Sequence, residues 1–231
     1  MKILALECSA TCASAAVAEN GVLLSECFSG VKLTHSQTLL PMAETALKTA
    51  GLTLDEVDGF AIAAGPGSFT GLRIGISALK GMAWAGDKPC AEISTLYAMA
   101  HGVLPFRGII VCCMDARCGQ VYNALFRSDG ERLTRLCDDR ALMADELAAE
   151  LAKMKDERFV FTGDGAKIGF DACDLESEIL APQYLINQRA SLVAAAACEK
   201  FEKGETVTAA ELMPIYLRLP QAERELKGRG K

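Results

Sequence analysis

Ala63-Ala-Gly-Pro-Gly-Ser-Phe-Thr-Gly-Leu-Arg-Ile-Gly-Ile-Ser77 is the stretch from which the fold is best inferred. The apolar run that leads into it, 57–64, has the length of a buried strand. The segment 72–85 that follows is long and apolar enough for a helix. Glycines between them can adopt dihedral angles that a side chain forbids and can admit a close approach to the backbone. This order predicts a strand, a tight glycine loop and a helix whose first amide groups are free to bind an anion.

The glycine loop matches neither of two common nucleotide-binding motifs. A Walker loop requires Gly-Lys-Ser/Thr, and no lysine occurs in this stretch before Lys80. A dinucleotide fingerprint beginning at Gly65 would need glycine at position 70, which is Thr70. Strand-to-helix turns also need glycine for steric reasons alone, so the loop by itself does not establish a ligand.

Composition and charge restrict the class of protein. The chain has 231 residues, of which 51% are hydrophobic and 23% charged, as expected for a globular protein with an ample core. Its length allows one large domain or two small lobes. A formal charge of −6 argues against a protein that grips nucleic acid by itself, since such affinity comes mainly from Lys and Arg.

The cysteines and histidines indicate a reduced, metal-free protein. Ten cysteines are present, but Cys112 and Cys113 are adjacent and no Cys-x-x-Cys occurs, so we expect buried free thiols rather than disulfides. The only two histidines, His35 and His101, lie far apart, which argues against structural zinc. Glu7 interrupts the first apolar run, which is therefore a strand rather than a secretory signal. No segment approaches the roughly 20 apolar residues of a membrane span. We expect a cytoplasmic protein.

The first half of the chain reads as three antiparallel strands followed by a helix. The strands are expected over 3–7, 13–18 and 22–28. Asn20-Gly21, between the second and third, is typical of a type I′ hairpin turn. A helix capped by Thr34 or Ser36 should run to Ala50, with a kink or a restart at Pro41.

The second half repeats this order. Strands are expected over 109–115, 120–126, 133–137 and 159–161, a helix over 142–154, and a glycine loop at 162–165. Asp129-Gly130 takes the place of the first hairpin turn. We therefore expect a duplication: an N-terminal lobe of residues 1–103, a C-terminal lobe of 104–218 and a flexible tail of 219–231. The helix 191–203 should cross back onto the first lobe (about 190–203), followed by a short extended piece at 214–218.

Two such halves describe an α/β protein on the actin-like ATPase (ribonuclease H-like) plan, with two duplicated lobes, each a mixed sheet flanked by helices. Enzymes on this plan hold phosphate between two acid-ended hairpins. The corresponding stretches here are 7–11 and 115–119. Ser9, Thr11 and backbone amides could bind a phosphate, and Glu7 or Asp115 could hold magnesium through water. The glycine that lets the first hairpin approach a phosphate is missing.

The helix 72–85 is apolar on two faces. One face carries Leu72, Ile76, Leu79 and Ala83, and the other carries Ile74, Ala78, Gly81, Met82 and Ala85. Only Arg73 and Lys80 are charged. A helix of this kind must be covered on most sides, either by its own domain or by a partner, and the sequence leaves both alternatives open.

Four segments resemble the bacterial TsaB family: 3–7, 65–75, 114–117 and 216–218. The resemblance implies a non-catalytic subunit that pairs with TsaD and activates it. TsaD transfers a threonylcarbamoyl group to the adenosine beside the anticodon of tRNAs, and the ATPase TsaE joins the assembly. The apolar helical interface could also form a homodimer when TsaD is absent. We expect contact with tRNA indirectly, through the complex, and no required cofactor, although weak ATP or ADP binding is compatible with this role.

The resemblance also assigns residues to a partner interface on the first lobe's helices: Leu39, Met42, Ala43, Leu72, Arg73, Ile76, Leu79 and Lys80. A vestigial nucleotide site would comprise Glu7, Ser9, Thr11, Gly65, Gly67 and Asp115. No catalytic residue or metal ligand is expected, because the segment 94–99, which matches the metal-binding His-x-x-x-His of TsaD, contains no histidine. The alternatives are an ATP-dependent phosphotransferase with degenerate phosphate loops, and a metallopeptidase, for which the ligands are lacking.

Overall fold

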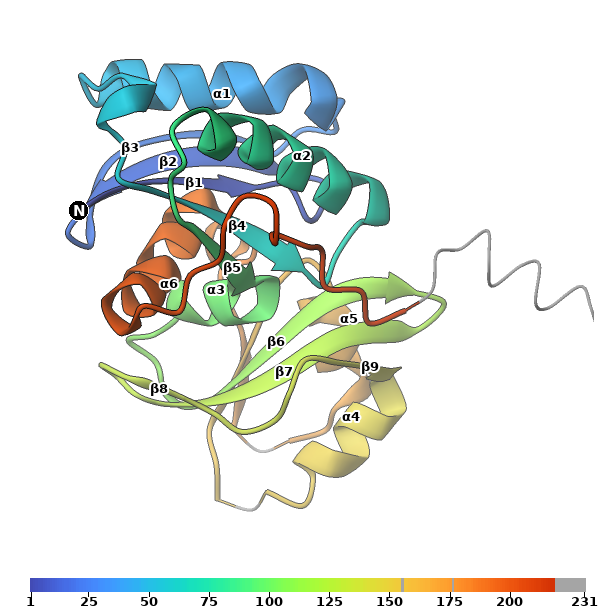
Figure 1. Cartoon of the computed structure of the whole chain (residues 1–231). Coiled ribbons are helices and arrows are strands. Elements are labelled where there is room, and N and C mark those ends of the chain that lie inside the picture. The colour runs from blue at the N-terminus through green and yellow to red at the C-terminus, as the bar shows by residue number, and fades with distance from the viewer. Residues whose placement is uncertain (155, 176, 219–231) are drawn as a thin grey trace, which may run out of the picture.

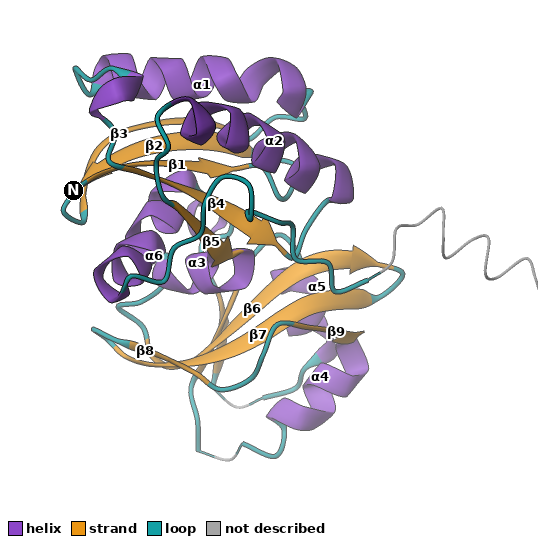
Figure 2. Ribbon diagram, in the orientation of Figure 1, coloured by secondary structure: helices purple, strands orange, loops and turns teal. Residues whose placement is uncertain are grey.

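The computed structural model describes residues 1–154, 156–175 and 177–218, which form two lobes, each built on one β-sheet (Figure 1, Figure 2). The first sheet contains β1 (Lys2–Glu7), β2 (Ala13–Glu19), β3 (Val22–Ser29), β4 (Gly59–Gly65) and β5 (Cys90–Ser94). Its order is β3-β2-β1-β4-β5. The hairpin pairs β1–β2 and β2–β3 are antiparallel, whereas β1–β4 and β4–β5 are parallel.

The second sheet repeats this arrangement. It contains β6 (Arg107–Arg117), β7 (Gln120–Asp129), β8 (Leu133–Arg135), β10 (Phe159–Thr162) and β11 (Glu178–Leu180), in the order β11-β10-β6-β7-β8. A short strand, β9 (Arg140–Met143), pairs with β7 beside this path. The central strand β6 is antiparallel to β7 and parallel to β10, as β1 is to β2 and β4. The shared order and directions confirm the duplicated actin-like fold predicted from the sequence.

Helices cover both faces of each sheet in layers (Figure 2). In the first lobe, α1 (His35–Thr49) and α2 (Phe69–Ala85) pack on the outer face. On its other face lie α3 (Thr95–His101) and α6 (Ala190–Lys203), and α3 also contacts the second sheet. The second lobe carries α4 (Ala144–Leu151) and α5 (Ala166–Ala172), and 3₁₀ turns occupy Leu54–Glu56 and Gln183–Leu185. The predicted crossing of the last helix onto the first lobe is confirmed, because α6 packs against β1, β2, β4 and β5.

The alternation of side chains along β1 connects the two apolar layers of the first lobe. Leu4 and Leu6 point into the cluster beneath α1 and α2, whereas Ile3 and Ala5 point into the cluster under α6. All four are buried, as expected for a central strand covered on both faces. Glu26 of β3 helps to hold α6 on the first sheet. Its carboxylate accepts hydrogen bonds from the backbone amide and the hydroxyl of Ser191 at the start of α6.

Two expected helix starts were wrong, and the restart expected as one alternative at Pro41 is absent. The helix after the glycine loop begins at Phe69 instead of residue 72, because the Ser68 hydroxyl accepts a hydrogen bond from the Gly71 amide and caps its first turn. Helix α1 continues through Pro41 without the expected restart. The helix expected from residue 142 begins at Ala144, because the preceding residues pair with β7 as β9.

The chemistry of the first hairpin turn was predicted correctly. Asn20 and Gly21 both have positive φ, 50° and 81°, as a type I′ turn requires. Residues 214–218 form no regular element, and the Ile215 amide donates to the Ala64 carbonyl at 2.7 Å. The flexible tail expected at 219–231 lies outside the described residues.

Two glycines of α2 provide a test of the packing at its first turn. A Cβ on Gly71 would overlap the backbone carbonyl of Cys8, whereas a Cβ on Gly81 would meet nothing within 4 Å. We expect Gly71→Ala to lower the free energy of unfolding by about 1–3 kcal/mol, typical of overpacking. The control Gly81→Ala should raise it by about 0.5–1 kcal/mol through helix propensity. Urea unfolding measures both, and equal effects would contradict the close approach at Gly71.

Candidate functional site

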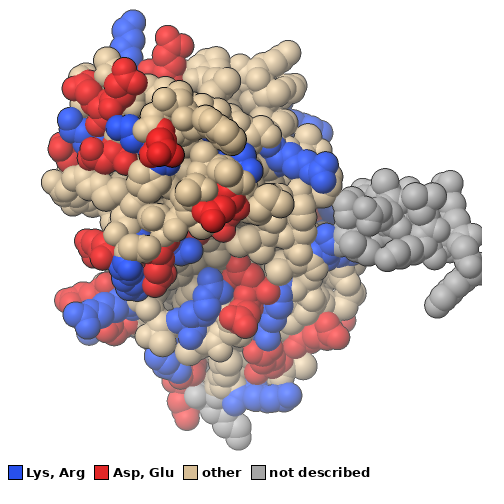
Figure 3. Space-filling view, viewed as in Figure 1, with Lys and Arg blue, Asp and Glu red and all other residues tan. Residues whose placement is uncertain are grey.

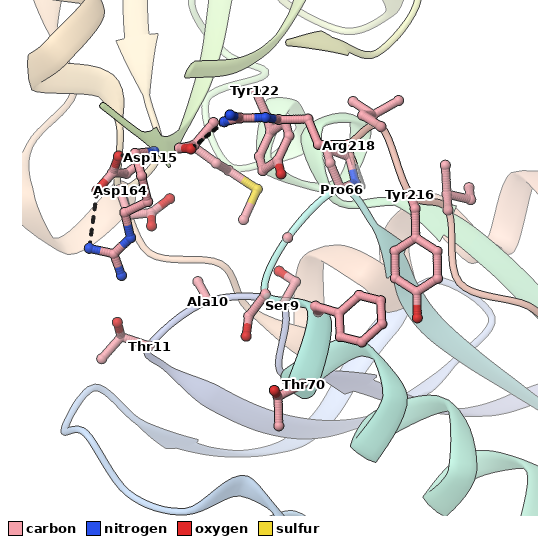
Figure 4. A pocket seen from close by; sticks show the side chains of 18 of the residues that line it. Ser9, Ala10, Thr11, Pro66, Thr70, Asp115, Tyr122, Asp164, Tyr216 and Arg218 are labelled. Carbon is pink, nitrogen blue, oxygen red and sulfur yellow. Dashed lines mark hydrogen bonds and ion pairs between the residues drawn. The ribbon is translucent and has the colours of Figure 1, made fainter. Parts of the chain in front are cut away.

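A cleft of about 870 Å³ separates the lobes where the strands of both sheets end. Its lining comes from the β1–β2 hairpin, the glycine loop, the end of β6, the loop after β10 and the C-terminal segment. Ser9 and Thr11 lie on one side, and Asp115 and Asp164 lie on the other (Figure 4). The structure therefore brings together Ser9, Thr11, Gly67 and Asp115 of the expected nucleotide site, but it places Glu7 and Gly65 outside the lining.

The two glycines of the expected nucleotide site are occupied by the chain's own backbone. A Cβ on Gly67 would overlap the Ser9 carbonyl, which also accepts a hydrogen bond from the Ser68 amide at 2.6 Å. Gly65, at φ 132°, lies against the Ile215 carbonyl in the same way. The close approach that these glycines permit therefore serves the packing of the chain's own backbone, although Gly67 also lines the cleft.

Glu7 is turned into the protein instead of toward the cleft. Its side chain is 1% exposed, and one carboxylate oxygen accepts a hydrogen bond from the Ser9 amide at 2.5 Å. The other oxygen, Oε2, has no hydrogen-bond partner among the described residues. Burial is the main cause that raises the pKa of Glu7 to about 7, against an ordinary value of 4.5. A carboxyl group in this position is a poor ligand for a hydrated magnesium ion in the cleft.

The acids that do line the cleft are held by neighbouring side chains. Asp115 accepts a hydrogen bond from the Arg117 amide at 2.7 Å and lies 3.7 Å from its guanidinium. Asp164 accepts a hydrogen bond from Gln188 at 2.8 Å. Within the part of the chain that the structure describes, no three His, Cys, Asp or Glu side chains gather in a way that could hold a metal ion.

A second hollow, of about 470 Å³, lies between α1 and α2 on the outer surface of the first lobe. We call it the α1–α2 groove, and its lining includes Ser36, Leu40, Arg73, Ile74, Ser77 and Ala78. Leu40 is 49% exposed. Much of the surface over α2 carries no charge in Figure 3. An apolar hollow between two helices is a surface on which another helix can pack.

Six residues expected at the partner interface lie in the core instead. Leu39, Met42, Ala43, Leu72, Ile76 and Leu79 are all buried, and all except Leu72 belong to the cluster between the helices and the first sheet. Of these six, only Leu39 reaches the groove. Arg73 is exposed and Lys80 is half-buried. The outward face of α2 carries Ile74, Ser77, Ala78 and Gly81, and ends at Trp84, which is 69% exposed. This face coincides with the second apolar stripe visible in the sequence.

One cluster at the site was not expected from the sequence. The Arg73 Nε donates to the Tyr216 hydroxyl at 3.0 Å, and the rings of Tyr216 and Phe69 stack with centroids 4.8 Å apart. In the sequence, the only signal for this cluster is the motif at 216–218.

The two similar sheets, with a cleft at their strand ends, define a protein of the actin-like ATPase fold. The family model described as "TsaD: tRNA N6-adenosine threonylcarbamoyltransferase" matches residues 29–226. The Escherichia coli "tRNA threonylcarbamoyladenosine biosynthesis protein TsaB" is 30% identical over 99% of this chain and 100% of its own length. "YeaZ from Pseudomonas aeruginosa" superposes with a TM-score of 0.82 at 27% identity, covering 94% of this chain and 99% of the other.

The chain belongs to the TsaB family. A tRNA N6-adenosine threonylcarbamoyltransferase from Phocaeicola vulgatus is also similar, at 36% identity over 43% of this chain and 34% of that protein. Among the described residues, no helix combines the length and hydropathy needed to span a bilayer.

The burial of Glu7 predicts a specific dependence of stability on pH. Between its ordinary pKa of 4.5 and its folded value of about 7, the native state holds a proton that the unfolded state has released. Stability contributed by this group is therefore lost as pH rises through that window. Glu7→Gln mimics the protonated form, so it should gain roughly 2–3 kcal/mol over wild type between pH 5 and pH 8. Urea unfolding at both pH values measures this gain, and an unchanged difference between the two proteins would contradict the buried, unpaired carboxyl group.

Proposed function

We propose that this chain is a non-catalytic subunit that pairs with TsaD and activates it for threonylcarbamoyl transfer to the adenosine beside the anticodon. TsaE joins the assembly, and the chain contacts tRNA only through this assembly. The chain needs no cofactor of its own. In the absence of TsaD the same surface forms a homodimer. The complex works in the cytoplasm, with the tRNA that it modifies. The observation that carries this proposal is the open α1–α2 groove in a member of the TsaB family.

The composition of the groove suits a partner helix. Ser77, Ala78 and Gly81 are small residues on the outward face of α2, so a second helix can approach its backbone closely. Leu40 and Ile74 supply apolar surface that is removed from water when the groove is covered, at roughly 25 cal/mol per Å². The buried neighbours Leu39 and Ile76 hold the two helices on the core cluster beneath the groove.

The similarity to the transferases indicates what the partner presents. The matching family model spans both α1 and α2 and carries the transferase's name, so the transferase has related helices. Two related helix pairs can meet about an approximate two-fold axis, each covering the groove of the other. A second copy of this chain offers the same surface, which accounts for the proposed homodimer.

The ATP-dependent phosphotransferase is the weaker alternative. Its phosphate loops would need the space that the carbonyl groups of Ser9 and Ile215 occupy at Gly67 and Gly65. Its first acid, Glu7, is enclosed and paired to its own hairpin. These contacts favour a structural role for the residues around the cleft over a role in nucleotide turnover.

Charge placed in the groove tests the docking surface. Ala78→Arg puts a cation where the partner helix would pack, so affinity for TsaD should fall by about 30-fold or more, as for other unpaired charges at interfaces. Isothermal titration calorimetry with TsaD from the same organism measures the loss. The matched control is Ala149→Arg on the exposed face of α4 in the other lobe. Wild-type affinity in Ala78→Arg, with both variants folded, would rule out this groove.

An omission experiment tests the activating role. Purified TsaD, TsaE, tRNA and the threonylcarbamoyl-adenylate donor are incubated with and without this chain, and modified adenosine is quantified by mass spectrometry. We expect modification to fall to background when the chain is left out, and Ala78→Arg should restore it less well than Ala149→Arg. Full modification without the chain would overturn the proposed function.

A further inference from the structure

The C-terminal segment 207–218 lies along α2 after the chain leaves α6 (Figure 1). It starts on β5, where Val207 and Cys90 exchange two backbone hydrogen bonds of 2.8 Å. The ammonium group of Lys80 on α2 then donates to the Ala210 carbonyl at 3.0 Å. Farther on, the Ile215 amide donates to the carbonyl at Ala64 beside the glycine loop. This segment is therefore held to the first lobe along the length of α2.

Tyr216 joins this segment to the first turns of α2. Its hydroxyl accepts a hydrogen bond from the Arg73 Nε at 3.0 Å, and its ring stacks on Phe69. The Arg73 guanidinium in turn lies over the Phe69 ring, 3.9 Å from the centroid. The planar guanidinium is thus fixed by a stacking contact and a hydrogen bond, which define its plane and its rotation within that plane.

Arg73 is also part of the α1–α2 groove. Because the Nε is used by Tyr216, the two terminal amino groups of the guanidinium remain for another acceptor. Neither of them forms a hydrogen bond with any residue in the described part of the chain. A fixed pair of N–H donors of this kind matches the two oxygens of a carboxylate.

The last described residue of the segment reaches the other lobe. Arg218 donates to the Ala116 carbonyl at the end of β6, at 2.6 Å, a contact visible in Figure 4. Tyr216 and Arg218 both line the cleft, whereas Arg73 lines the groove. The motif 216–218 is therefore a physical link between the second lobe and the docking surface.

From these contacts we infer that Tyr216 is a positioning residue for the docking surface: it holds Arg73 at the edge of the groove, ready to receive a carboxylate of the partner helix. The inference rests on the proposed pairing with TsaD. Fixing a long side chain before binding removes an ordering cost of about 0.5–1.5 kcal/mol, which corresponds to about 2- to 12-fold in affinity. Without Tyr216, the side chain of Arg73 would become ordered only when the partner binds.

A double-mutant cycle tests the inference. The dissociation constant for TsaD is measured for wild type, Tyr216→Phe, Arg73→Ala and the double variant, and thermal unfolding verifies that each is folded. Tyr216→Phe keeps the ring stack and removes only the hydroxyl, so affinity should fall about 2- to 12-fold. In the Arg73→Ala background the same change should have no effect. Tyr184→Phe, at an exposed tyrosine of the second lobe, is the matched control and should bind like wild type.

Three outcomes would overturn the inference by itself. Equal losses from Tyr216→Phe with and without Arg73 would show that Tyr216 acts through general stability, and no loss would show that it does not position Arg73. If the loss caused by Arg73→Ala does not shrink between 50 mM and 500 mM salt, the acceptor is not a carboxylate. Failure of wild type to bind TsaD at all would instead overturn the proposed function, together with this inference.

Discussion

Three close contacts between backbone segments at the glycine loop determine the arrangement of the first lobe. Gly65 meets the carbonyl of Ile215, Gly67 meets that of Ser9, and Gly71 meets that of Cys8. Any side chain at these positions would separate the β1–β2 hairpin, the start of α2 and the C-terminal segment. Because all three contacts are made at once, the first turn of α2 is fixed against the sheet, and the direction in which its outer face points is fixed with it. The glycine loop, whose sequence suggests a ligand site, thus serves to pack three segments of the backbone together.

The parts of the fold that follow from local rules could be predicted from the sequence. The turn at Asn20-Gly21 has a backbone requirement that few other residue pairs meet, and the repeated order of elements made the duplication recognisable. Pairing with neighbouring strands determined the elements for which the local sequence gives no clear signal. Residues 142 and 143 were expected in a helix, but β7 offers hydrogen-bond partners to 140–143, which become β9. The short strands β5 and β11 lack a periodic signal of their own, since their neighbours in the sheets define them.

The candidate site was predictable only in outline. Both faces of α2 are apolar, so periodicity identified two stripes without saying which faces the sheet. The structure shows that the stripe with the larger side chains, Leu72, Ile76 and Leu79, is buried, and that Ile76 and Leu79 share a core cluster with residues of β1 and β4. The small residues Ala78 and Gly81 remain outside, where a close helix can use them. Glu7 was misplaced for a related reason: its position at the end of a strand suggested the cleft, but the Ser9 amide draws its carboxylate inward.

The remaining question is why a fold whose proposed role requires no chemistry between its lobes keeps them in a fixed relation. The contacts of the C-terminal segment supply a physical answer. Arg218 is bound to the second lobe, Tyr216 is bound to α2, and only Leu217 separates them. A change in the angle between the lobes would therefore pull on Tyr216 and, through it, on the guanidinium of Arg73 at the groove. If Tyr216 positions Arg73 as inferred, the second lobe influences the docking surface through the segment that orders one side chain of that surface.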